Sequence, residues 1–197
     1  MKRLELFGLE GIAEIDTGDS IGALICDGCV RQGIELADDD VLVVAQKVIS
    51  KAEGRMVRLD EVKPSPRARQ LAEELDKDAD HSAREIRREI QTRTGKSVGV
   101  IISDSFGRAW RVGTVDVAVG VAGMKPVKDE RGFIDRHGYQ LKAAVAAVAD
   151  EIASAAELVM GKRDGVPVVI VRGYQLEKKE DGSVQELLRP EAEDLFR

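Results

Sequence analysis

The sequence lacks an excess of positive charge, a cysteine framework and any long apolar run. Its formal net charge of -6 argues against non-specific nucleic-acid binding, because a basic face supplies most of the affinity of such binding. No stretch approaches the roughly 20 apolar residues that a membrane-spanning helix needs. Residues 1–15 mix charged with apolar side chains and contain no signal-peptide core. We therefore expect a soluble cytoplasmic protein that binds neither nucleic acid nor membrane.

The two cysteines, Cys26 and Cys29, form a C-x-x-C pattern that has no partner motif. A metal site would need a second ligand pair, and a redox site would need a strand–turn–helix setting. Neither is present, and both histidines (His81 and His137) lie far away in the sequence. The pattern therefore predicts two small residues packed on one side of a helix.

Apolar material is sufficient for a core, because 43% of the 197 residues are hydrophobic, and the length fits one domain or two small packed ones. Short apolar runs alternate unevenly with segments that carry helix caps and helical spacing. This pattern favours an α+β fold with a mixed sheet over a regular doubly wound one. The predicted strands are residues 4–9, 12–15, 41–45, 47–49, 98–103, 115–121 and 166–171, and the predicted helices are residues 18–32, 66–75, 82–94 and 141–160.

Residues 94–97 (Thr-Gly-Lys-Ser) look like the end of a phosphate-binding loop. That loop requires glycine where this chain has Ile90. The order of elements is also wrong, since a helix is expected to end here and not to begin. We interpret the segment as a helix stop.

The strongest chemical signal follows the central apolar run of the chain. Asp104 and Ser105 place a carboxylate and a hydroxyl at the end of a buried strand, where catalytic groups often gather. Mg2+ and Mn2+ prefer such oxygen ligands, usually together with phosphates. Arg108 and Arg111 can each contact a phosphate through two hydrogen bonds. The alternative is a turn capped by Asp104, with Trp110 packed between the two arginines.

Residues 50–55 (Ser-Lys-Ala-Glu-Gly-Arg) follow another apolar stretch and leave two interpretations open. A lysine at a strand end, followed by glycine and arginine, can present positive charge and N–H groups to an anion. The same residues also suit a charged hairpin turn.

Several blocks of this sequence, in matching order, resemble the coenzyme F420-0:L-glutamate ligase family. The resemblance spans most of residues 3–175, and the ending from Gln185 to Phe196 is similar to the bacterial branch, where a flavin-binding reductase domain often follows. It implies a single gamma-glutamyl ligase-like α+β domain over residues 1–197, an intertwined homodimer, and use of GTP with Mg2+ or Mn2+, with K+ as a further candidate ion. The blocks are Val48–Arg55, Ile101–Arg108, Ala149–Ala153 and Val171–Gly173.

The resemblance also implies site residues in this chain. Lys51 and Asp104 correspond to catalytic positions, and Asp104 and Ser105 correspond to metal ligands. Many family members have glutamine or glutamate in place of Lys162, and a charged lysine cannot ligate a metal. Arg108 and Arg111 are our own candidates for binding the coenzyme's phosphodiester or the carboxylates of glutamate. The nucleotide-binding positions are Ile12, Ala13, Glu14, Ile15, Gln46, Lys51, Gly161 and Lys162.

A larger departure from the family lies near residues 78–80. Family members carry several dozen further residues here, including an Asn-Ala-Gly-x-Asp-x-Ser-Asn motif that supplies a metal-binding Asp and a nucleotide-binding Asn. The segment is either missing from the sequence at hand or deleted from the protein, and the intact Lys51 and Asp104 motifs favour the former. An intact mass of 21.5 kDa would establish the deletion.

The implied reaction joins the precursor F420-0 to L-glutamate at the expense of GTP, through an acyl phosphate. Phosphoryl transfer of this kind needs charge neutralisation and in-line positioning more than covalent help. Two other interpretations stay open. One is a catalytically inactive relative that binds nucleotide or deazaflavin, which Lys162 and the absent motif favour. The other is an interaction module whose acidic surface binds a partner protein.

Overall fold

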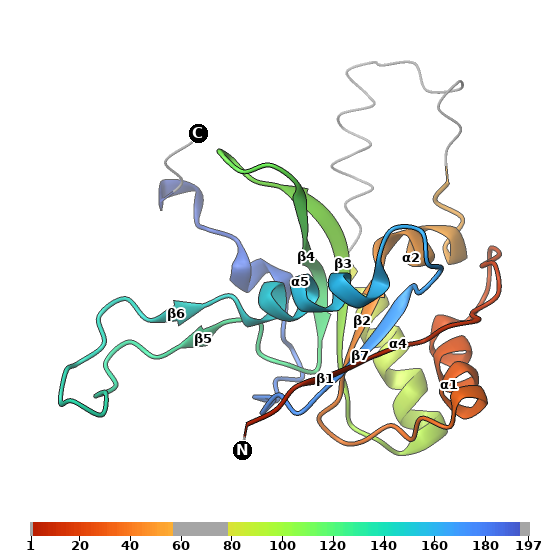
Figure 1. Cartoon of the computed structure of the whole chain (residues 1–197), viewed down its shortest axis with the longest axis horizontal. Coiled ribbons are helices and arrows are strands. Elements are labelled where there is room, and N and C mark those ends of the chain that lie inside the picture. The colour runs from red at the N-terminus through yellow and green to blue at the C-terminus, as the bar shows by residue number, and fades with distance from the viewer. Residues whose placement is uncertain (1, 57–78, 194–197) are drawn as a thin grey trace.

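A five-stranded mixed sheet with helices on both faces forms the body of the molecule (Figure 1). The computed structural model describes residues 2–56 and 79–193. The strand order is β1-β7-β2-β3-β4, in which only β2 and β3 are parallel neighbours. The α+β prediction is therefore confirmed. The strands are β1 (Glu5–Gly8), β2 (Val41–Ala45), β3 (Gly99–Gly107), β4 (Thr114–Ala122) and β7 (Val168–Arg172).

Side chains of the central strands alternate between two hydrophobic cores, as the period of a strand requires. One core lies under helices α1 (Ile21–Gln32) and α4 (Ala79–Thr94), and the other lies under helix α5 (Val148–Met160). Because both faces are covered, the strands read as continuous apolar runs. The first core takes Leu42, Val44, Val100, Ile102, Val168 and Ile170, and the second takes Val41, Val43, Ile101, Val169 and Val171.

Helix α1 has the caps that its sequence predicts. The Ser20 hydroxyl accepts a hydrogen bond from the Ala23 N–H at 3.1 Å, and Gly33 ends the helix in the left-handed conformation (φ 65°). Cys26 and Cys29 are free, buried thiols on its inner face, which confirms the packing interpretation. Burial raises the pKa of Cys29 to about 11.

The predicted strand at residues 47–49 is wrong, because helix α2 (Gln46–Ala52) follows β2 directly. Val48 and Ile49 are buried, and so short an apolar pair fits a helix as well as a strand. Residues 12–15 are also not a strand. The predicted helix at residues 66–75 lies outside the described residues.

Two helix starts also differ from the prediction. Helix α4 already includes residues 79–81, so Ser82 lies within the helix and not at its start, and its hydroxyl donates to a carboxylate oxygen of Glu53. Helix α5 begins at Val148, seven residues later than the Ala-rich pattern indicated. The residues before it belong to a projecting arm, where strand pairing replaces the helix.

The arm consists of residues 126–147 and extends from the body of the molecule (Figure 1). Its strands β5 (Lys128–Asp129) and β6 (Val145–Ala146) pair antiparallel, and an isolated bridge joins Ile134 to Gln140 further out. Phe133, Ile134 and Tyr139 are exposed on it. Large apolar side chains that are exposed together often mark an interaction surface.

After β7 the chain returns along β4 and ends in two 3-10 helices, η2 (Val184–Leu187) and η3 (Glu191–Glu193). Buried Asp80 fixes this return, because it accepts hydrogen bonds from the Val121 N–H (2.7 Å) and the Ser183 hydroxyl (2.6 Å). Among the described residues, no helix is long and apolar enough to cross a membrane.

Candidate functional site

Four segments that are distant in sequence meet at one edge of the sheet. Strands β2 and β3 are parallel, so their carboxyl ends share that edge, with Ala45 opposite Ser103. Strand β7 runs antiparallel to β2 and begins there, while β1 ends there. Backbone hydrogen bonds join the segments: the Leu9 N–H donates to the Val168 C=O (2.9 Å), and the Ala45 N–H donates to the Pro167 C=O (3.0 Å). The chain topology therefore assembles this edge.

A cavity of about 430 Å³ lies at this edge, within the size range of small-molecule sites. Its walls come from the segment after β1, the β2–α2 junction, the end of β3 and the loop between α5 and β7. Arg108 and Arg111 do not line it, because they lie exposed in the turn between β3 and β4. The sequence-predicted residues that do line it are Ile12, Ala13, Glu14, Ile15, Gln46, Lys51, Asp104, Ser105, Gly161 and Lys162.

Lys51, in the last turn of α2, forms an ion pair with Glu14, and both residues line the cavity. The hydrogen bond from Lys51, followed by its charge, holds the pKa of Glu14 below its ordinary value. The Glu14 side chain is 79% exposed, and such exposed pairs contribute little to stability. Lys51 can therefore exchange this carboxylate for a more highly charged anion at small cost.

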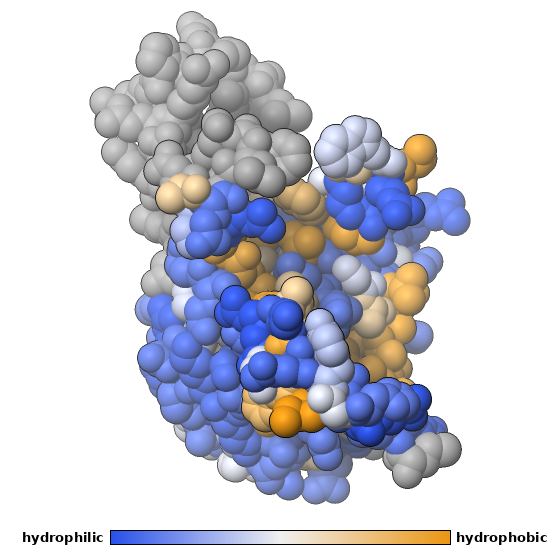
Figure 2. All heavy atoms as spheres, turned by 90° about the vertical axis from the view of Figure 1, so that its left-hand side faces the viewer, coloured by the Kyte–Doolittle hydropathy of each residue, from blue (hydrophilic) through white to orange (hydrophobic). Residues whose placement is uncertain are grey.

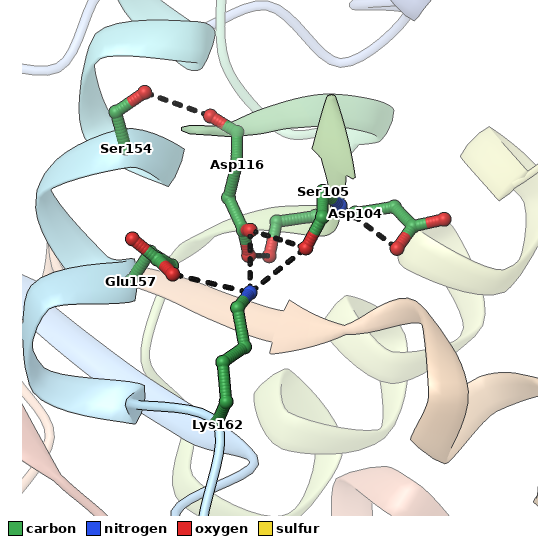
Figure 3. A network of polar contacts seen from close by, with 7 residues as sticks. Asp104, Ser105, Asp116, Ser154, Glu157 and Lys162 are labelled. Carbon is green, nitrogen blue, oxygen red and sulfur yellow. Dashed lines mark hydrogen bonds and ion pairs between the residues drawn. The ribbon is translucent and has the colours of Figure 1, made fainter. Parts of the chain in front are cut away.

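Asp104 and Ser105 are consecutive strand residues, so their side chains point in different directions. The Asp104 carboxylate accepts a hydrogen bond from the Ser105 N–H at 2.8 Å and points away from Lys162 (Figure 3). The Ser105 hydroxyl points the other way and donates to Asp116 Oδ1 at 3.0 Å. The two predicted metal ligands thus belong to different parts of the cavity.

The ammonium of Lys162 lies among oxygens from β3, β4 and α5 (Figure 3). Its Nζ is 2.8 Å from Ser105 Oγ, 3.1 Å from Asp116 Oδ1 and 3.1 Å from Glu157 Oε1. Burial acts to lower the pKa of Lys162, but hydrogen bonds to Asp116 and Glu157 outweigh it and raise the pKa above its ordinary value. Lys162 therefore places a positive charge beside Ser105, Asp116 and Glu157 at neutral pH.

Strand register places Asp116 in this cluster. Ser105 and Asp116 are direct partners on β3 and β4, and the register shifts by one residue between Ile102 and Ser103. A bulge of this kind frees an N–H group, and Asp150 of α5 accepts a hydrogen bond from Ala118 N–H at 2.9 Å. The bulge and its contact fix β4 against α5, which brings Asp116 close to Glu157.

A glycine turn brings Lys162 back toward the sheet. Helix α5 ends at Met160, and the φ of the next residue, Gly161, is 56°, in the left-handed region. A Cβ at this position would also lie 2.4 Å from Asp164 Oδ2. Another residue here would displace the loop that carries Lys162.

Asp116 and Glu157 were not among the predicted site residues, although each carried a signal. Asp116 is a single carboxylate within the Val-rich strand, and Glu157 is an acid within a largely apolar helix. A buried carboxylate requires hydrogen bonds or a cation, and Asp116 has the hydroxyls of Ser103 and Ser105 as well as Lys162.

The two ends of the cavity differ in their suitability for a divalent cation. Asp104 offers a carboxylate at the cavity wall, and hard cations are commonly held by one carboxylate together with phosphate oxygens. Ser105, in contrast, already contacts an ammonium. Nowhere in residues 2–56 and 79–193 do three His, Cys, Asp or Glu side chains converge closely enough to hold a metal ion. Asp104 therefore fits a metal only in company with a bound phosphate.

Comparison with known proteins bears on what this cavity does. The family model described as F420-0:Gamma-glutamyl ligase matches residues 11–82 and 75–173. The coenzyme F420:L-glutamate ligase of Methanothermobacter thermautotrophicus is 37% identical over 249 aligned positions, covering 98% of this chain and 99% of the relative. Its namesake from Archaeoglobus fulgidus is 37% identical over 248 positions, covering 99% and 97%.

The first of these alignments is 52 positions longer than the 197-residue chain, so that relative has at least 52 residues without a counterpart here. The two segments of the family match overlap at residues 75–82. The family model and the two relatives nevertheless cover the parts of the sequence that form the cavity. The chain belongs to the F420-0:gamma-glutamyl ligase family.

Proposed function

We propose that this protein is a GTP-dependent ligase that joins L-glutamate to the coenzyme F420 precursor F420-0 through an acyl phosphate. The relatives are named coenzyme F420:L-glutamate ligases, which supports the ligase class. The observation that carries the proposal is that Lys51, Asp104 and Lys162 all line the same cavity. Its location where two parallel strands end is typical of nucleotide sites in α/β sheets.

The proposed reaction has two steps. A carboxylate oxygen of the precursor attacks the γ-phosphorus of GTP, GDP leaves, and an acyl phosphate forms. The amine of glutamate then attacks the acyl carbon, inorganic phosphate leaves, and the nitrogen loses a proton to give the amide. Lys51 turns from Glu14 to the transferring phosphoryl group and offsets its negative charge. A divalent ion held by Asp104 and phosphate oxygens would supply further charge neutralisation.

Two further parts of the proposal concern the substrate and the assembly. Arg108 and Arg111 lie outside the cavity, at the exposed tip of the β3–β4 hairpin. We propose that they contact the distal part of F420-0, because guanidinium groups suit its phosphodiester.

The arm supports the proposed homodimer. Figure 2 looks onto the side from which it projects, where hydrophobic residues lie among hydrophilic ones. Phe133 and Ile134 are 66% and 71% exposed in the single chain. Light scattering after size-exclusion chromatography tests this: Phe133→Glu should shift a dimer to monomer, and a monomeric parent protein would refute the dimer.

The decisive test incubates the purified protein with F420-0, GTP, Mn2+ and L-glutamate and measures product masses. We expect a product heavier by one or more glutamyl groups, with equimolar GDP for each amide formed. Asp104→Ala should abolish glutamate-dependent GDP release. Asp27→Ala is the matched control, because Asp27 is an exposed carboxylate on α1 outside the cavity. Turnover that persists in Asp104→Ala would contradict the assigned role of Asp104.

A second candidate function is a catalytically inactive relative that binds GTP or the deazaflavin without turnover. The lysine in the oxygen cluster and the residues of the relative that have no counterpart here favour it. Calorimetry separates the two functions. Saturable binding of GTP without any glutamylated product would support the inactive relative, whereas product formation excludes it.

A further inference from the structure

The Lys162 ammonium lies in an oxygen shell that three separate elements supply. The shell consists of a hydroxyl oxygen from β3, a carboxylate from β4 and a carboxylate from α5, at 2.8, 3.1 and 3.1 Å. Lys162 itself comes from the loop that follows Gly161. These contacts are more numerous than a surface ion pair requires, and they converge on one point.

The charges around this point require a cation. The Asp116 side chain is 6% exposed and that of Glu157 is 22% exposed, so both carboxylates are largely removed from water. Two neighbouring carboxylates in such a place repel each other. The ammonium of Lys162, which contacts both, offsets this repulsion.

An ammonium and a divalent ion cannot share this position. Mg2+ and Mn2+ sit about 2.0–2.2 Å from their oxygen ligands, whereas the ammonium holds the same oxygens near 3 Å. Any metal bound to Ser105 and Asp116 would have to displace Lys162 into solvent. The displacement is opposed by repulsion between the ammonium and the incoming divalent ion and by the loss of the three contacts.

We propose that Lys162 is a tethered cation that occupies the Ser105–Asp116–Glu157 cluster and excludes a divalent ion from it. If the proposed ligase function holds, the metal of that reaction then binds only at the Asp104 end; the exclusion of a divalent ion from the cluster does not depend on that function. At the opposite end Lys162 supplies a fixed positive charge, which does not depend on the concentration of metal ions. Loss of the ammonium converts the cluster into a divalent-cation site.

Mn2+ binding to the nucleotide-free protein tests the proposal. Calorimetry measures it, and so does the decrease in the electron paramagnetic resonance signal of free Mn2+. We expect Lys162→Gln to bind one Mn2+ more than the parent protein. The affinity of that site should exceed any in the parent by about tenfold or more, the scale on which the surroundings of a metal site act. Lys162→Met, which removes the charge without adding an oxygen, should gain the same site with weaker affinity.

Two variants show whether the gained ion lies in the cluster. Adding Asp116→Asn to Lys162→Gln should remove the extra Mn2+. Lys178→Gln is the matched control, because Lys178 is 50% exposed and pairs with Asp39 at 2.8 Å, while Lys162 is 55% exposed. The control should keep the stoichiometry of the parent protein.

Thermal unfolding gives a second measurement that does not depend on turnover. Lys162→Met leaves two carboxylates without their cation, so its Tm should fall, and Mn2+ should restore it by more than it raises the Tm of the parent. Equal Mn2+ stoichiometry and equal Tm gains in the parent and in both Lys162 variants would overturn the proposal. An extra Mn2+ in Lys162→Gln with no ligase product from the parent would overturn only the proposed function.

Discussion

The cavity contains two lysines whose surroundings differ strongly. Lys51 is held by one carboxylate that is 79% exposed, whereas Lys162 is held by three oxygens, one of them on a carboxylate that is 6% exposed. An exposed pair is screened by water and loses little when it opens. A pair with a buried member is costly to break, because the remaining charge stays out of water.

This difference suggests a division of labour between the two lysines. In the proposed reaction, Lys51 leaves Glu14 and follows the charge of a bound phosphate. Lys162 stays in place and sets the charge of the cavity wall. The two lysines therefore differ because of the number and the burial of their partners.

The largest expected effect follows from removing the mobile cation. Lys51→Met should lower kcat by about 100-fold or more, because a group that stabilises developing charge is typically worth that much. Its Tm should stay close to that of the parent protein, since the pair with Glu14 is exposed. Steady-state GDP release and thermal unfolding measure the two quantities. A large fall in Tm with unchanged kcat would reverse the roles that we assign to the two lysines.

An intermediate effect is expected from neutralising the buried partner of the fixed cation. Asp116→Asn should lower the free energy of unfolding by about 2 kcal/mol, the scale of charged hydrogen bonds. Urea denaturation measures it. Asp104→Asn is the control, because that exposed carboxylate has its hydrogen bond from the neighbouring backbone and should change stability by less than about 0.5 kcal/mol. Equal losses in both variants would show that Asp116 does not hold the cluster together.

The smallest effect concerns the pH dependence of the exposed pair. Lys51 lowers the pKa of Glu14, so the pair is formed above the ordinary carboxyl pKa and is lost as the pH falls through the lowered value. A titration of the Glu14 carboxyl carbon by NMR should show this lowered pKa. In Lys51→Met the pKa should return to its ordinary value, and an unchanged pKa would mean that the pair does not form in solution.

Patterns of adjacent residues predicted most of the elements around the site. The apolar runs that became β2 and β7 fill both cores, so their burial was readable from composition alone. The Ser20 cap marked the start of α1. Errors arose where a pattern fits two structures: Val48-Ile49 suits strand or helix, and the alanines before Val148 suit a helix until the arm pairs them.

The predicted cavity residues lie in short sequence blocks: the family resemblance alone indicated residues 12–15, and the chemistry of their side chains also indicated the pair 104–105. Asp116 and Glu157 were missed because each depends on a partner elsewhere in the sequence. Strand register brings Asp116 to Ser105, 11 positions away, and the end of helix α5 brings Lys162 back to Glu157, 5 positions away. Arg108 and Arg111 were predicted as substrate contacts from their charge, and the β3–β4 hairpin places both outside the cavity wall.

The sequence by itself determined the alternation of buried strands and capped helices, and it placed a lysine, a carboxylate and a hydroxyl at element ends. These features depend on neighbours along the chain, whose geometry is local. Only the tertiary structure decided that Ser105 faces Asp116 and that Lys162 lies between two carboxylates. That outcome depends on a bulged register and on the packing of α5 against β4, which are set by contacts between distant residues.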